Sequence, residues 1–121
     1  MKILIIDDDP SMQLIIGAAL KKYGNFYVIH AGSGLEGLEL AGRHQPDLIL
    51  LDVMIQDLNG PSVLQKLSEE KNTRDIPVIF LTGKDQPEEG ASLLGLGARA
   101  VITKPFDPTQ MVALVKKLIK P

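Results

Sequence analysis

Six polar side chains directly follow short apolar runs of this sequence: Asp7, Asp8, Asp9, Asp52, Thr82 and Lys104. Asp52 interrupts a run of leucine, isoleucine and valine residues, where a carboxylate is costly unless it has a use. Carboxylates that gather in one place repel one another unless a cation lies among them. The set therefore predicts a cation site built from aspartates.

The types of these side chains narrow the chemistry. The sequence has no cysteine and two histidines, so oxygen atoms are the ligands on offer, and these favour Mg²⁺ or Mn²⁺ over zinc. One carboxylate can also act as a nucleophile towards phosphorus. The Thr82 hydroxyl and the Lys104 ammonium group would then bind the oxygens of a phosphoryl group.

Some of these residues also have ordinary structural interpretations. Asp9 precedes Pro10, which is typical of a helix N-cap, and we favour the cap over a metal ligand. Thr82 alone would fit a strand-end turn equally well. We expect no catalytic role for His30 or His44.

The elements that position these residues follow from the apolar pattern. Five short runs rich in Ile, Val and Leu show little polar alternation, as strands do when both faces of a parallel sheet are covered. These predicted strands are 3–6, 27–31, 48–51, 78–81 and 100–103. In a parallel sheet, the residues after each strand meet at the carboxyl edge, which is where ligands bind.

A helix is expected after each predicted strand. The first runs from Pro10 to about Tyr23, with Gly24 as its stop, and Ser33 with Glu36 forms a capping box for the second. The start signals of the other helices are Gly60-Pro61, Gln86-Pro87 and Asp107-Pro108. The pattern predicts an α/β fold with an open, doubly wound, five-stranded parallel sheet, (βα)₅.

Length and composition agree with one globular domain over residues 1–121, either a whole protein or part of a longer one. The chain is 45% hydrophobic and 23% charged, with a net charge of −2. A domain that binds nucleic acid should be basic, so direct nucleic-acid binding is not expected. No apolar stretch is long enough for a membrane span or a signal peptide, which predicts a soluble, cytoplasmic domain.

In this order and at these strand ends, Asp7-Asp8, Asp52, Thr82 and Lys104-Pro105 resemble the receiver domain of bacterial two-component response regulators. Gly60, eight residues past Asp52, matches the glycine that the family has there. The resemblance covers essentially the whole chain. It implies a flavodoxin-like sheet with strand order 2-1-3-4-5.

The resemblance also implies a role for each residue. Asp52 would accept a phosphoryl group, and Mg²⁺ would be held by Asp7, Asp8, Asp52 and the backbone carbonyl of Met54. Lys104 would neutralise the acyl phosphate, and the Thr82 hydroxyl would move to bind a phosphoryl oxygen. Such a domain is no enzyme in the usual sense, but a signalling phosphoacceptor that catalyses its own phosphorylation and slow dephosphorylation.

Partners follow from the same resemblance. The phosphoryl donor would be a histidine kinase or a phosphotransfer protein. The output would pass through the fourth helix, the fifth strand and the fifth helix to a downstream protein or effector domain. A phosphorylation-dependent dimer is an open alternative for the output.

Three departures from the family pattern stand out. Gln56 replaces the proline that is common four residues after the phosphoacceptor, which should loosen the turn but leave the site intact. Val101 replaces the usual aromatic switch residue three positions before the lysine. Met54 and Lys84 occupy the positions that influence dephosphorylation, and an apolar Met54 cannot orient a water molecule, so we expect slow hydrolysis.

Two other functions compete with this one. Asp7 and Asp9 also satisfy the D-x-D motif of haloacid dehalogenase-type phosphatases, although that interpretation leaves Asp52 unexplained. A pseudo-receiver that is never phosphorylated would be a pure interaction module. We reject a flavodoxin-like FMN site, because three aspartates after the first strand would repel its phosphate.

Overall fold

The computed structural model describes residues 1–83 and 89–119. Five parallel strands form one sheet in the order β2-β1-β3-β4-β5, which confirms the predicted topology. The strands are β1 (Lys2–Ile6), β2 (Tyr27–Ala31), β3 (Leu48–Asp52), β4 (Val78–Gly83) and β5 (Ala100–Lys104). The helices are α1 (Pro10–Gly24), α2 (Gly34–His44), α3 (Gly60–Glu69), α4 (Glu89–Gly95) and α5 (Pro108–Leu118).

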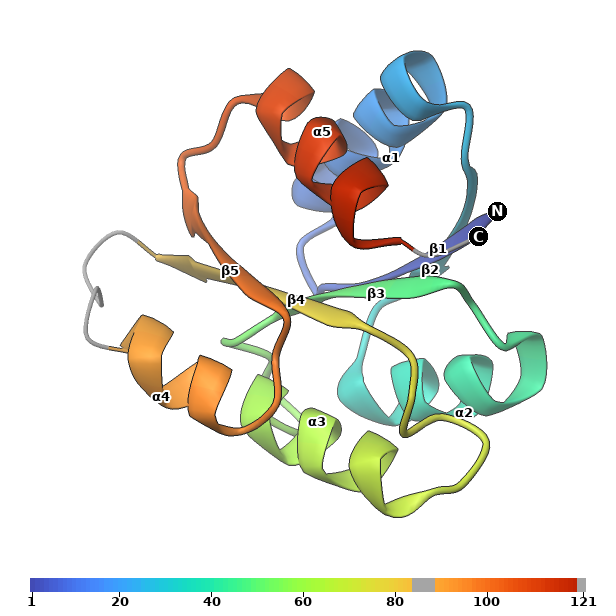
Figure 1. Ribbon diagram of the computed structural model, residues 1–121, viewed down its shortest axis with the longest axis vertical. Helices are drawn as coiled ribbons and strands as arrows, with labels where there is room; N and C mark the ends of the chain where they lie inside the picture. Colours follow the sequence, from blue (N-terminus) through green and yellow to red (C-terminus); the bar gives the residue numbers. More distant parts are fainter. Residues whose placement is uncertain (84–88, 120–121) are drawn as a thin grey trace.

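The helices cover both faces of the sheet, with α1 and α5 on one side and α2, α3 and α4 on the other (Figure 1). Alternate residues of β1 show why two faces exist: Ile3 and Ile5 pack towards α1 and α5, whereas Leu4 and Ile6 pack towards α2 and α3. All four side chains are completely buried. The apolar runs lack polar alternation because neither face of the sheet meets water.

Most helix starts agree with the sequence. Asp9, Ser33 and Asp107 each accept a hydrogen bond from a backbone N–H of the helix that follows. The predicted stop of α1 is wrong by one residue, since the helix includes Gly24 and the left-handed residue is Asn25, with φ 55°. Asparagine tolerates this conformation, so a glycine is not needed there. The predicted start of the fourth helix, at Gln86-Pro87, lies outside the described residues.

Three strands run further than the apolar runs predict. β3 includes Asp52, β4 includes Thr82 and Gly83, and β5 includes Lys104. Their backbones stay in register with a neighbouring strand: Asp52 opposite Leu81, and Gly83 opposite Lys104. Pairing of the backbone continues where the apolar side chains end, so the sheet itself holds these polar residues.

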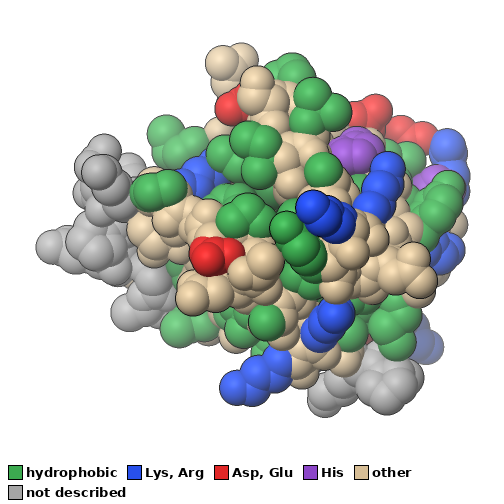
Figure 2. Space-filling view, turned by 90° about the horizontal axis from the view of Figure 1, so that it is seen from above, with side chains coloured by type: hydrophobic (Ala, Val, Ile, Leu, Met, Phe, Trp, Pro, Cys, Tyr) green, Lys and Arg blue, Asp and Glu red, His purple; other side chains and the backbone are tan. Residues whose placement is uncertain are grey.

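The face covered by α1 and α5 carries several basic side chains (Figure 2). The last turns of these two helices hold Lys21, Lys22, Lys116 and Lys117. Cations near a helix C-terminus are stabilised by the helix dipole, so these lysines need no bound ligand to explain them. Within residues 1–83 and 89–119, no helix has both the length and the apolar character that a membrane crossing requires.

Candidate functional site

Three aspartates meet at the carboxyl edge of the sheet, as the sequence predicts. One carboxylate oxygen from each of Asp7, Asp8 and Asp52 lies within 4.8 Å of the others. Asp7 and Asp52 are buried, whereas Asp8 is exposed to solvent. Adjacent strands β1 and β3 bring them together, because Ile6 pairs with Leu51 and the polar residues follow directly. The chain thus gathers three negative charges from two segments that are far apart in sequence.

Burial disfavours the ionised form of Asp7. Burial raises the pKa of Asp7 to about 6, helped by the nearby charges of Asp52 and Asp8 and opposed by a hydrogen bond from the Asp9 N–H and by Lys104. Among the described residues, none donates a hydrogen bond to the buried Oδ2 atom of Asp7. A buried oxygen without a donor is costly. A hard divalent cation would satisfy it, so the donor set fits Mg²⁺ or Mn²⁺.

Lys104 brings a positive charge to the aspartate cluster. Its Nζ atom lies 3.4 Å from Asp52 Oδ2 and 3.9 Å from Asp7 Oδ2. A quarter of its side chain remains exposed to solvent. The lysine can therefore attract a further anionic group beside Asp52.

Thr82 lies on β4, one residue beyond the partner of Asp52. It is buried, and its hydroxyl donates to the carbonyl oxygen of Gly83 at 3.0 Å. Val101 lies one strand further, opposite Phe80, and is half-buried against the core under α3 and α4. The other predicted tuning residue, Lys84, lies outside the described residues.

Asp9 does not join the cluster. Its carboxylate is exposed and accepts a hydrogen bond from the Ser11 N–H at 2.9 Å, which confirms the N-cap interpretation. The phosphatase alternative needs Asp9 as a general acid beside Asp7. Because its carboxylate caps α1, Asp9 is not available as that general acid.

The segment after Asp52 packs closely against the end of β3 and contacts the site. The Met54 N–H donates to Asp52 Oδ1 at 3.2 Å, and the Met54 side chain is 66% exposed. A Cβ atom at Gly60 would lie 2.7 Å from the Asp52 carbonyl oxygen and 2.9 Å from Val53 Cα. Only glycine lets α3 begin this close to the end of β3, which explains why glycine stands at this position.

Sequence reasoning missed Gln13 at the other side of the cluster. Its side-chain amide donates to the backbone carbonyls of Asp7, at 2.9 Å, and Ala31, at 2.8 Å, so it ties the ends of β1 and β2 together. Its carbonyl oxygen bonds to His30 Nδ1. Burial, together with the charge of Lys21, lowers the pKa of His30. The spacing of residues in the sequence does not predict that a glutamine on a helix will hydrogen-bond to the ends of two strands.

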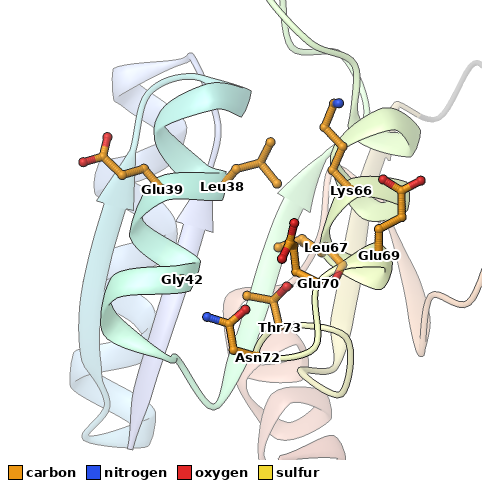
Figure 3. A pocket seen from close by; sticks show the side chains of 9 residues that line it. All are labelled: Leu38, Glu39, Gly42, Lys66, Leu67, Glu69, Glu70, Asn72 and Thr73. Atoms are coloured by element: carbon orange, nitrogen blue, oxygen red, sulfur yellow. Dashed lines mark hydrogen bonds between the residues drawn. The ribbon is translucent and has the colours of Figure 1, made fainter.

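A groove of about 440 Å³ lies between the C-terminal halves of α2 and α3 (Figure 3). Leu38 points into it from α2, whereas Glu39 points away. These halves of the helices lie towards the amino edge of the sheet, because a crossover helix runs back against its strands. The groove is therefore remote from the aspartate cluster.

The fold and the cluster together define a class of protein: a doubly wound sheet that presents a cation-binding set of carboxylates at its carboxyl edge. Comparison with family models matches residues 3–116 to the response regulator receiver domain. The chain belongs to this family and is a receiver domain of the two-component response regulators.

Individual relatives agree. The chain is 40% identical over 119 residues to the DNA-binding dual master transcriptional regulator RpaA of Synechocystis, covering 98% of this chain and 49% of that protein. It is 34% identical over 118 residues to protein PilH of Pseudomonas aeruginosa, covering 98% of this chain and 97% of PilH. The chain spans about half the length of RpaA, of the response regulator Rre1 of Synechocystis and of PhoP of Bacillus subtilis.

A solved structure shares the fold. The receiver domain of the Francisella response regulator 1452 superimposes with a TM-score of 0.88 at 29% identity, over 97% of this chain and 94% of that chain.

Proposed function

We propose that Asp52 is the phosphoacceptor of this receiver domain and that residues 1–121 form one such domain. The observation that carries the proposal is that the Asp52 carboxylate lies close to both the Asp7–Asp8 pair and Lys104. A nucleophilic carboxylate oxygen attacks phosphorus as the bond from phosphorus to the donor's histidine nitrogen breaks. The electron pair leaves with that nitrogen, and an acyl phosphate forms on Asp52.

The charges of the site support this chemistry. Asp7, Asp8, Asp52 and the Met54 carbonyl would hold Mg²⁺ or Mn²⁺, which neutralises charge on the phosphoryl oxygens when bound. Lys104, whose ammonium group lies 3.4 Å from Asp52 Oδ2 and 3.9 Å from Asp7 Oδ2, would balance the remaining negative charge on the acyl phosphate. The donor is a histidine kinase or a phosphotransfer protein, and the site lies in the cytoplasm.

The response would begin at Thr82. Its hydroxyl turns from the Gly83 carbonyl to a phosphoryl oxygen, which changes the surface of α4, β5 and α5. With Val101 in place of an aromatic side chain, no coupled rotation of an aromatic ring takes part. The output partner is a downstream protein or an effector domain, and a second copy of the chain is the alternative partner.

The experiment compares phosphorylation by a small-molecule phosphodonor with and without Mg²⁺. The wild-type chain should take up one phosphoryl group only with the cation, and Asp52→Asn should take up none. Asp9→Asn is the matched control, because asparagine keeps the cap of α1 and leaves the cluster intact. If Asp52→Asn labels as well as the wild type, or if Asp9→Asn abolishes labelling, the assignment is wrong.

Hydrolysis should be slow. The side chain of Met54 is exposed beside Asp52 and offers no hydrogen bond to an attacking water molecule. Lys84 is the second position expected to tune this rate. The acyl phosphate is then long-lived, and the domain itself catalyses both its formation and its slow loss.

A further inference from the structure

The loop between β3 and α3 is attached by hydrogen bonds at two points to other segments of the protein. The Asp57 carboxylate accepts from the Gly34 N–H at 2.9 Å and from the Leu35 N–H at 3.1 Å, both at the start of α2. The neighbouring Gln56 N–H donates to Asp8 Oδ2 at 3.3 Å. We call residues 56–58 the strap, because they link α2 to the aspartate cluster.

The first attachment consists of the two hydrogen bonds between Asp57 and the start of α2. The first N–H groups of a helix have no partner within the helix, and Asp57 accepts from the first two of α2 while Ser33 Oγ accepts from Glu36 N–H. The Gly34 and Leu35 donors hold the pKa of Asp57 below its usual value, so the carboxylate is ionised at neutral pH.

The fit of the strap against α2 is close. A Cβ atom at Gly34 would lie 2.9 Å from both Leu58 Cβ and the Leu58 carbonyl oxygen. Gly34 is buried under the strap, although it begins a helix, where glycine is otherwise unfavourable. The glycine therefore allows the strap to lie this close to α2, where the Asp57 hydrogen bonds hold it.

The second attachment acts on the one exposed aspartate of the cluster. Asp7 is held by the Asp9 N–H and Asp52 by the Met54 N–H and Lys104, whereas the contact that the structure shows for the Asp8 carboxylate is the Gln56 N–H. An exposed carboxylate rotates freely unless a donor fixes it. A carboxylate has about four lone-pair sites, so one N–H leaves the others for a cation.

We propose that Gln56 is a positioning residue for the metal site: its backbone N–H, held in place by the Asp57 anchor on α2, orients Asp8 for the cation. The inference rests on the proposed cation site of Asp7, Asp8 and Asp52. Proline, expected at position 56 from the resemblance, has no N–H and could not make this contact. The departure at Gln56 thus adds a donor instead of merely loosening the turn.

The coupling must work in both directions. If the anchored strap favours cation binding, then cation binding favours the anchored strap by the same factor. Mg²⁺ should therefore slow hydrogen exchange at the Gly34 and Leu35 amides, although α2 contributes no ligand to the cluster. This links occupancy of the site to the start of α2.

The experiment measures Mg²⁺ affinity by titration calorimetry on the full chain. Gln56→Pro should weaken binding by roughly threefold to tenfold, which is less than the 10–100-fold typical of buried supporting partners because Asp8 is exposed. Gln56→Ala keeps the N–H and should bind as the wild type does. Asp57→Ala should weaken binding to a similar extent, and Asp57→Asn, which keeps one acceptor, should fall between.

Ser33→Ala is the matched control for Asp57→Ala, because it also removes a cap from α2 but leaves the strap attached. It should leave Mg²⁺ affinity unchanged. Hydrogen exchange at Gly34 and Leu35 should respond to Mg²⁺ in the wild type and in Gln56→Ala, but not in Gln56→Pro.

The outcomes separate the two proposals. A wild-type chain that binds no Mg²⁺ would overturn the proposed cation site and this inference with it. Wild-type binding together with unchanged affinity in both Gln56→Pro and Asp57→Ala would overturn the positioning role alone. Equal weakening by Asp57→Ala and Ser33→Ala would also overturn it, because α2 stability and not the strap would then set the affinity.

Discussion

Replacing Asp7 by asparagine is expected to stabilise the metal-free protein. The side chain of Asp7 is completely buried, and its pKa rises from 3.8 to about 6. Asparagine has nearly the same shape, keeps an acceptor for the Asp9 N–H and places an amide N–H₂ group near the Asp52 carboxylate. The substitution therefore removes the cost of a buried charge without opening a cavity.

The size of the effect follows from the shift in pKa. Each unit corresponds to about 1.4 kcal/mol, so the shift makes the ionised carboxylate cost roughly 3 kcal/mol in the folded chain. The folded chain binds the proton more tightly than the unfolded chain, so stability falls as pH rises between the two pKa values. The gain from Asp7→Asn should be about 3 kcal/mol near pH 7.5 and about 1 kcal/mol near pH 4.5.

The assay is urea unfolding with a chelator present, at both pH values. In a parallel thermal unfolding experiment, a gain of about 3 kcal/mol would raise the melting temperature by roughly 10 °C in a domain of this size. Asp9→Asn removes the same charge two residues away and should change stability by less than about 0.5 kcal/mol, since asparagine caps as well as aspartate. Mg²⁺ should stabilise the wild type more than Asp7→Asn. A variant less stable than the wild type at neutral pH, or a gain that does not shrink in acid, would show that the buried charge of Asp7 does not destabilise the folded chain.

Three further substitutions test other parts of the site. Met54→Asn should speed loss of the acyl phosphate several-fold after the phosphodonor is removed, because its carboxamide can orient water; an unchanged decay rate would contradict this. Gly60→Ala should destabilise the chain by roughly 1–3 kcal/mol in urea unfolding, because the new Cβ atom meets backbone at Asp52 and Val53; wild-type stability would show that α3 can shift at no cost. Lys104→Met should lower metal-free stability at neutral pH by about 1–2 kcal/mol, since it leaves two buried carboxylates without their cation; a more stable variant would rule out that role for the lysine.

The parts of the fold that depend on local patterns could be predicted from the sequence. The runs at 3–6 and 48–51 lack polar alternation because both faces of the sheet are covered, and this fixes the layer architecture. Once the strands are known to be parallel, Asp7, Asp8 and Asp52 must meet at one edge. The order of the strands needed the family resemblance as well.

Local sequence patterns predict the ends of helices and strands less accurately. Gly24 was the natural stop for α1, but the left-handed position fell on Asn25, which accepts that conformation at small cost. The apolar runs end before the strands do, because backbone pairing continues through Asp52, Thr82 and Lys104 without needing apolar side chains. Boundaries depend on hydrogen bonds to neighbouring strands, and a single segment does not reveal these.

Contacts between distant segments are the least predictable. Gln13 reaches the ends of two strands from a helix, and Asp57 caps a helix 22 or 23 residues earlier in the chain. In the sequence, both are ordinary polar residues. Their roles exist only once the sheet has brought β1, β2 and β3 side by side.

The proposed role of Asp52 is to accept a phosphoryl group with the help of a divalent cation. The most direct measurement treats the chain with a phosphodonor and Mg²⁺, reduces the acyl phosphate with borohydride and locates the resulting homoserine by peptide mass spectrometry. We expect homoserine at position 52 and nowhere else, and none when the cation is chelated. Homoserine at Asp7, Asp8 or Asp9, or equal yields with and without the cation, would contradict it.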